Sequence, residues 1–139
     1  MWTKNFNKVG LQSMTKILVV DDELLLRNVL YDYLTRNNYE VFTVGDAEKA
    51  IEVAAIEKPS LALVDIKLPK SSGIELTKEL KAILPDLIII IMTGYPSLET
   101  AVNAMKNGAT EYIIKPFRLD ELNKILKKYS DPTYKVASE

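Results

Sequence analysis

Short runs of aliphatic residues alternate along the chain with longer segments in which apolar residues recur at three- and four-residue steps. The runs are rich in β-branched residues and cover positions 17–20, 41–44, 61–64, 87–92 and 112–114. Continuous apolar runs of this length are typical of strands buried on both faces of a parallel sheet. Five strands are therefore predicted.

The segments that follow these runs have the periodicity of amphipathic helices, each with one buried stripe. The predicted stripes are Leu26, Val29, Leu30, Tyr33 and Leu34; Ala47, Ala50, Ile51, Ala54 and Ala55; Leu76, Leu80, Ile83 and Leu84; Leu98, Ala101, Val102 and Met105; and Leu119, Leu122, Ile125, Leu126 and Tyr129. Asp46 and Ser97 are predicted helix N-caps, and Gly108 is predicted to end the fourth helix in a left-handed conformation. Strict strand and helix alternation predicts a doubly wound α/β fold with a five-stranded parallel sheet.

Length and charge limit the classes of protein to consider. The 139 residues suit one domain. We interpret 1–13 as an N-terminal extension outside the core, 14–129 as the domain and 130–139 as a tail. A net charge of -1 gives no attraction to a phosphate backbone, so direct nucleic-acid binding is not expected. No apolar segment reaches the roughly 18 residues that span a membrane.

The chain contains neither cysteine nor histidine. Thiol and imidazole catalysis and the usual zinc ligand sets are therefore excluded, which leaves oxygen ligands and hard cations such as Mg²⁺. The absence of cysteine is compatible with a cytoplasmic location, which we expect.

Polar residues stand where four of the predicted strands end. Asp21 and Asp22 follow the first strand, Asp65 the third, Thr93 the fourth and Lys115 the fifth. In an open parallel sheet these ends share the edge at which ligands bind. Two carboxylates about 4 Å apart repel by roughly 4 kcal/mol at an effective dielectric near 20, and a divalent cation relieves that repulsion. The residues favour a Mg²⁺-assisted phosphoryl-transfer site with aspartate as the acceptor.

Each of these residues also has a simpler structural explanation. A strand-end aspartate is more often a helix cap or a turn residue, but that explanation must hold separately for three aspartates. Lys115 alone would be a surface charge, and Thr93 alone would start a turn. Tyr112, on the fifth strand, is as readily a core residue as a functional one.

Four segments carry a family resemblance: VVDDE at 19–23, LVDIKLPKSSGIEL at 63–76, IIMTGY at 90–95 and EYIIKPF at 111–117. In order and spacing they resemble the signature blocks of response-regulator receiver domains, over about residues 15–129. Four matches in one order are far more specific than any single short motif. The resemblance implies the flavodoxin-like (βα)5 fold with strand order 2-1-3-4-5.

The resemblance also implies a role for each residue at the strand ends. Asp65 would accept a phosphoryl group from a partner's phosphohistidine. Asp22, Asp65 and the backbone carbonyl of Lys67 would bind Mg²⁺, with Mn²⁺ as an alternative, and Asp21 would act through a bound water. Thr93 and Lys115 would contact the phosphoryl oxygens.

Two further implications concern conformation. The Lys115–Pro116 peptide bond is expected to be cis. Thr93 would move toward the phosphoryl group while Tyr112 turns inward behind it, and this pair would form the switch.

A docking surface is predicted beside the acidic residues. If the first helix buries its predicted stripe, then Leu24, Leu25 and Asn28 face outward. Together with Pro116 and Phe117 they would receive a helical bundle that carries a phosphohistidine.

Lys67 and Tyr95 are predicted to tune the lifetime of the phosphorylated state. They would flank the path of a water attacking the phosphoryl group, so their bulk should slow hydrolysis. The same pair makes the chain resemble the single-domain sporulation phosphorelay type of receiver.

The partners implied are a sensor histidine kinase or a histidine phosphotransferase, and a downstream protein target. The chain would be a monomer or a weak dimer that catalyses its own phosphorylation and slow dephosphorylation and turns over no small molecule. The alternative is a receiver from a longer transcription regulator. An aspartyl-phosphate hydrolase of the haloacid-dehalogenase type is disfavoured, because it needs a second aspartate where Lys67 stands.

Overall fold

A parallel sheet forms the centre of the molecule. The computed structural model describes residues 14–130, so the predicted extension and positions 131–139 of the predicted tail lie outside the described residues. The sheet strands are β1 (Lys16–Val20), β2 (Glu40–Val44), β3 (Leu61–Asp65), β6 (Ile88–Thr93) and β7 (Glu111–Ile114). They lie in the order β2-β1-β3-β6-β7, and every pairing is parallel. This confirms the predicted fold class and the order 2-1-3-4-5.

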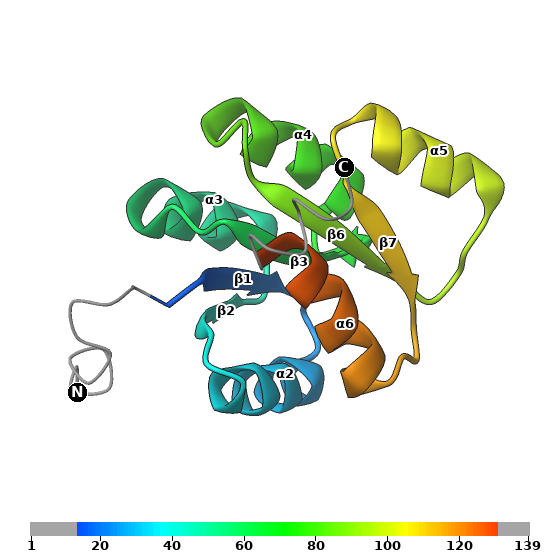
Figure 1. Cartoon of the computed structure of the whole chain (residues 1–139). Coiled ribbons are helices and arrows are strands. Elements are labelled where there is room, and N and C mark those ends of the chain that lie inside the picture. Colours follow the sequence, from blue (N-terminus) through cyan, green and yellow to red (C-terminus); the bar gives the residue numbers. More distant parts are fainter. Residues whose placement is uncertain (1–13, 131–139) are drawn as a thin grey trace.

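Helices cover both faces of this sheet (Figure 1). They are α2 (Leu24–Arg36), α3 (Ala47–Glu57), α4 (Gly73–Ile83), α5 (Leu98–Lys106) and α6 (Leu119–Ser130). One core cluster joins alternate strand residues to α3, α4 and α5, and a second joins the other strand residues to α2 and α6. The doubly wound arrangement follows from strands that are apolar on both sides.

The predicted helix boundaries are confirmed by their caps. The side chain of Asp46 accepts a hydrogen bond from the Lys49 amide at 2.8 Å, and that of Ser97 accepts one from Thr100 at 3.1 Å. Gly108 has a φ of 110°, a left-handed conformation that favours glycine.

A small hairpin after β3 was not predicted. Its strands are β4 (Lys67–Leu68) and β5 (Ser71–Ser72), and they pair antiparallel. Two-residue strands are too short to produce a periodic pattern. Ser72 ends the hairpin and caps α4, because its hydroxyl accepts a hydrogen bond from the Glu75 amide at 3.1 Å.

The predicted stripe of α5 was wrong. Leu98 is 82% exposed, Val102 45% and Met105 39%, whereas Ala104 is buried and Ala101 is partly buried. The helix packs on the sheet through its small residues, which leaves its large apolar side chains on the outer side.

Single members of three other predicted stripes were also wrong. Val29 is 39% exposed, Ile83 is 40% exposed, and Ala55 is exposed as well. Each stands at the edge of its stripe, where the helix surface turns away from the sheet. The stripe of α6 is confirmed, with Leu122 and Leu126 fully buried.

Gly73 lets α4 begin directly against the end of β3. Its amide donates a hydrogen bond to the carbonyl of Ile66 at 2.8 Å. A Cβ atom at this position would lie only 2.3 Å from the carbonyl oxygen of Asp65. Any larger residue would push α4 away from the strand that carries Asp65.

We expect Gly73→Ala to lower the free energy of unfolding by about 1–3 kcal/mol, because the new methyl group collides with backbone. Gly94→Ala is the matched control, since a Cβ there meets nothing within 4 Å. The control should change the free energy of unfolding by no more than about 1 kcal/mol. Urea unfolding of both variants measures the difference, and equal effects would contradict the close-packing explanation.

Candidate functional site

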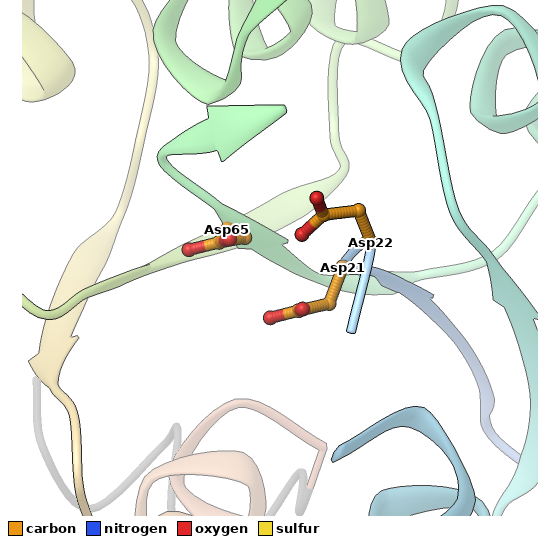
Figure 2. Close-up of side chains that lie close together, drawn as sticks. All are labelled: Asp21, Asp22 and Asp65. Atoms are coloured by element: carbon orange, nitrogen blue, oxygen red, sulfur yellow. The ribbon is translucent and has the colours of Figure 1, made fainter. Parts of the chain in front are cut away.

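The predicted strand-end residues meet at one edge of the sheet. Asp21 and Asp22 follow β1, Asp65 and Thr93 end β3 and β6, and Lys115 follows β7. Figure 2 shows the three aspartate side chains close together, Asp21 and Asp22 from the segment after β1 and Asp65 from the end of β3. One carboxylate oxygen from each aspartate lies within 4.8 Å of the others. The predicted convergence is therefore observed.

Lys115 lies between two of these carboxylates. Its Nζ is 2.7 Å from Oδ2 of Asp21 and 3.3 Å from Oδ1 of Asp65. Its backbone amide donates to the carbonyl of Thr93 at 2.8 Å, which ties the residue to the neighbouring strand. The following peptide bond, Lys115–Pro116, is cis, as expected.

Asp21 is fully buried, and each of its polar groups has a partner. Its amide donates to the carbonyl of Val44 at 3.1 Å, and its Oδ1 accepts from the amide of Glu23 at 2.8 Å. Its backbone carbonyl accepts from Nη1 of Arg27 at 2.7 Å. Lys115 occupies Oδ2. Burial of this carboxylate is tolerated because it is hydrogen-bonded on every side.

The site carries more negative than positive charge. Burial raises the pKa of the Asp65 carboxyl, and repulsion from Asp21 raises it further, while Lys115 opposes both effects. Burial alone would lower the pKa of the Lys115 ammonium, but the hydrogen bonds and charges of Asp21 and Asp65 together outweigh burial and raise it. Three clustered carboxylates beside one ammonium form an oxygen-rich donor set that fits a hard divalent cation.

Thr93 and Tyr112, on the adjacent strands β6 and β7, line one small cavity. Thr93 is buried, and its hydroxyl accepts a hydrogen bond from the Tyr95 amide at 3.1 Å. A cavity of about 10 Å³, near the lower limit for one water molecule, is lined by both Thr93 and Tyr112. Tyr112 is half-buried against the core. Tyr112 therefore packs against the core and also lines the cavity beside Thr93.

Lys67 and Tyr95 come together on the surface of the site. Both side chains are exposed, and Nζ of Lys67 lies 4.5 Å from the centroid of the Tyr95 ring. This is a cation–π contact. It joins the hairpin after β3 to the loop after β6. The Lys67 carbonyl as a metal ligand stays a prediction.

The family model of the response regulator receiver domain matches residues 17–127. The chain belongs to this family. Receiver domains of two-component response regulators interact with histidine kinases, phosphotransferases and downstream targets. They bind a divalent metal at an acidic pocket, and Asp21, Asp22 and Asp65 form such a cluster in this receiver domain.

Curated relatives include both short and long proteins. The sporulation initiation phosphotransferase F of Bacillus subtilis is 35% identical over 114 residues, which cover 82% of this chain and 92% of the relative. The regulatory protein AtoC of Escherichia coli is 36% identical over 84% of this chain, but only 25% of the relative is covered. This receiver domain thus spans about a quarter of that longer regulator.

Solved receiver structures are close in fold. A CheY-like receiver domain protein from Methanospirillum hungatei has a TM-score of 0.80 and 36% identity, covering 86% of this chain and 96% of that one. A response regulator from Burkholderia pseudomallei, solved with a phosphorylated aspartic acid, a calcium ion and citrate, has a TM-score of 0.76 and 32% identity, covering 89% of this chain and 71% of that one.

The predicted docking residues of the receiver domain are all accessible to some degree. Leu24 is 60% and Leu25 70% exposed, and Asn28 is also exposed. Pro116 and Phe117 line an apolar groove between the start of α2 and the start of α6. Leu26 and Val29, which sequence periodicity placed in the core, line the same groove.

Two contributors to the site were missed from the sequence. Arg27 acts through a bond from its side chain to a backbone carbonyl, which leaves no recurrent pattern in the sequence. Gly45 stands beside the Arg27 guanidinium, and the need for a small residue there becomes visible only in three dimensions.

Among residues 14–130, no helix combines the length and apolar character needed to cross a bilayer.

Proposed function

We propose that this receiver domain accepts a phosphoryl group from a partner's phosphohistidine onto Asp65 in a Mg²⁺-dependent reaction. The observation that carries the proposal is the grouping of Asp65 with Asp21, Asp22 and the ammonium of Lys115. An oxygen of Asp65 forms a bond to phosphorus while the bond from phosphorus to the imidazole nitrogen breaks. The electron pair of the broken bond stays on the imidazole.

The residues around Asp65 have separate tasks in this reaction. Asp22, Asp65 and the Lys67 carbonyl would hold the metal, and Asp21 would act through a water bound to it. The metal, when bound, offsets the charge of the phosphoryl oxygens. Nζ of Lys115 already lies 3.3 Å from Oδ1 of Asp65, so it would donate a hydrogen bond to an oxygen of a phosphoryl group placed there.

Thr93 and Tyr112 form the switch in this proposal. The Thr93 hydroxyl has to turn from the Tyr95 amide toward the phosphoryl group. Because Tyr112 lines the same small cavity, that movement changes the packing between β7 and α5. A new charge at Asp65 would in this way select between two packing states.

The phosphorylated domain could pass its signal on in two ways. Relay of the phosphoryl group is favoured by the similarity to a sporulation phosphotransferase along 92% of that relative. Control of an attached effector is supported by the similarity to longer transcription regulators such as AtoC. In both cases the domain acts through contacts with other proteins.

The groove beside the site is proposed to receive the phosphohistidine protein. Pro116, Phe117 and Lys115 are among the residues that line it. The exposed Leu24 and Leu25 lie at the start of α2, which also contributes to the lining. Exposed apolar side chains beside a reaction centre fit the apolar surface of a helical bundle.

Incubation with a phosphorylated histidine phosphotransferase and Mg²⁺ tests the phosphoacceptor. We expect stable label on the wild type and none on Asp65→Asn, which keeps the shape of the side chain but lacks the nucleophilic oxygen. Chelation of the metal should abolish labelling. Return of the label to a second histidine protein would identify a relay. Equal labelling of Asp65→Asn would refute the proposed acceptor.

We expect phosphorylated Asp65 to persist for minutes or longer, because Lys67 and Tyr95 restrict water on the side opposite Asp65. The double variant Lys67→Ala, Tyr95→Ala should lose its label about tenfold faster, which corresponds to about 1.4 kcal/mol of barrier. Lys78→Ala, which removes an exposed lysine from α4, is the control. Label decay within seconds in the wild type, with no change in the double variant, would contradict this role.

Substitution of Leu24 and Leu25 by glutamate should slow phosphotransfer from the protein donor about tenfold, as expected for residues at the centre of an interface. Labelling by acetyl phosphate should not change, because that donor needs no docking surface. Ile56→Glu replaces an exposed aliphatic residue of α3, on the opposite face of the sheet, and serves as the control. Equal losses with both donors would count against docking.

A further inference from the structure

We propose that Arg27 is a positioning residue for the metal site, and that Gly45 provides the space in which it acts. The inference rests on the proposed function, because it concerns how the metal-binding carboxylates are held. Arg27 touches neither Asp65 nor the reacting phosphorus in this proposal; it acts through the backbone of Asp21.

Arg27 lies in the first turns of α2 and reaches back to the end of β1. Its Nη1 donates a hydrogen bond to the carbonyl oxygen of Asp21 at 2.7 Å. That carbonyl belongs to the peptide unit that joins Asp21 to Asp22. Because a peptide unit is planar, a bond that fixes its oxygen also fixes the direction in which the chain enters Asp22.

Asp22 depends on this backbone restraint more than Asp21 does. The carboxylate of Asp21 is fully buried and hydrogen-bonded to the Glu23 amide and to Lys115. Asp22 is exposed, so packing restrains it little. The position of the Asp22 carboxylate is therefore set mainly by the peptide unit that Arg27 holds.

Gly45 makes room for the guanidinium. A Cβ atom on Gly45 would lie 2.9 Å from Nη1, 3.6 Å from Cζ and 3.9 Å from Nη2 of Arg27. Gly45 does not have a positive φ, so backbone conformation does not demand glycine here. The residue directly before it, Val44, accepts the amide hydrogen bond of Asp21. At the end of β2, Val44 therefore accepts the amide hydrogen bond of Asp21, and Gly45 leaves space for the Arg27 guanidinium that bonds to the Asp21 carbonyl.

The charge of the Arg27 guanidinium and its hydrogen bond to the Asp21 carbonyl have opposite effects on cation binding. A measurement of metal affinity can therefore distinguish them. A guanidinium near the site disfavours a metal ion by Coulomb repulsion. If this repulsion is the larger effect, removing or displacing the guanidinium should tighten metal binding. If its hydrogen bond to the Asp21 carbonyl is the larger effect, the same change should weaken metal binding. The geometry points to position, because the guanidinium bonds directly to the peptide between two of the metal-binding residues.

The test is the dissociation constant of Mn²⁺ for the unphosphorylated protein, measured from the electron paramagnetic resonance signal of the free ion. Gly45→Ala should displace the guanidinium, and Arg27→Met should remove it. Each variant should bind Mn²⁺ about 3- to 10-fold more weakly, the range expected for one lost hydrogen bond. Arg36→Met, which removes an exposed arginine from the end of the same helix, is the matched control and should bind as the wild type does.

The double variant Arg27→Met, Gly45→Ala decides whether the two residues act together. It should bind Mn²⁺ as Arg27→Met does, because the added methyl group then has no guanidinium to displace. Additive losses, or unchanged or tighter binding in both single variants, would overturn the positioning role while leaving the proposed function intact. Failure of the wild type itself to bind Mn²⁺ would overturn the proposed function and this inference with it. Gly45→Ala displaces only the far end of a flexible side chain, so urea unfolding should show a loss of stability no larger than the contribution of one hydrogen bond.

Discussion

The single ammonium of Lys115, held between the carboxylates of Asp21 and Asp65, is the interaction on which the site depends. It balances part of the charge of three clustered aspartates and leaves the remainder for a cation. Such a cluster is tolerable only where every buried oxygen has a partner, and Asp21 meets that condition through contacts from β2, α2 and the segment after β7. The unbalanced charge is a cost in stability that the surrounding fold has to offset.

The sheet offsets that cost through the apolar core clusters on both of its faces, while the acidic residues stand at the carboxyl ends of the strands. β1 is buried apart from Lys16 at its start, and β3 is buried along its whole length. Gly73 lets α4 begin directly against the backbone of Asp65. The acidic residues therefore stand at the ends of well-buried strands, which suits a metal site whose carboxylates have to be pre-organised.

Sequence reasoning predicted the fold and the convergence of the strand ends because both follow from the apolar runs and from where they stop. The prediction of the buried helix face was wrong for α5, where a small residue is buried and a large one is not. Ala104 packs against the sheet, and Leu98 is exposed. It also missed the hairpin at Lys67, which is too short for a periodic signal, and the bond from Arg27 to a backbone carbonyl, which depends on three-dimensional distance alone. The roles of the individual site residues came from the resemblance to receiver domains and not from the hydrophobic pattern.

Few side chains of α5 are buried, and this affects how easily the helix can move. Among the described helices, α4 has four buried residues, whereas α5 buries only Ala104. A helix with so few anchoring contacts can slide or tilt at a small free-energy cost, while its neighbours stay fixed. Since α5 begins just after the loop that follows Thr93 at the end of β6, this weakly anchored helix is the element that a change at the site can displace most easily.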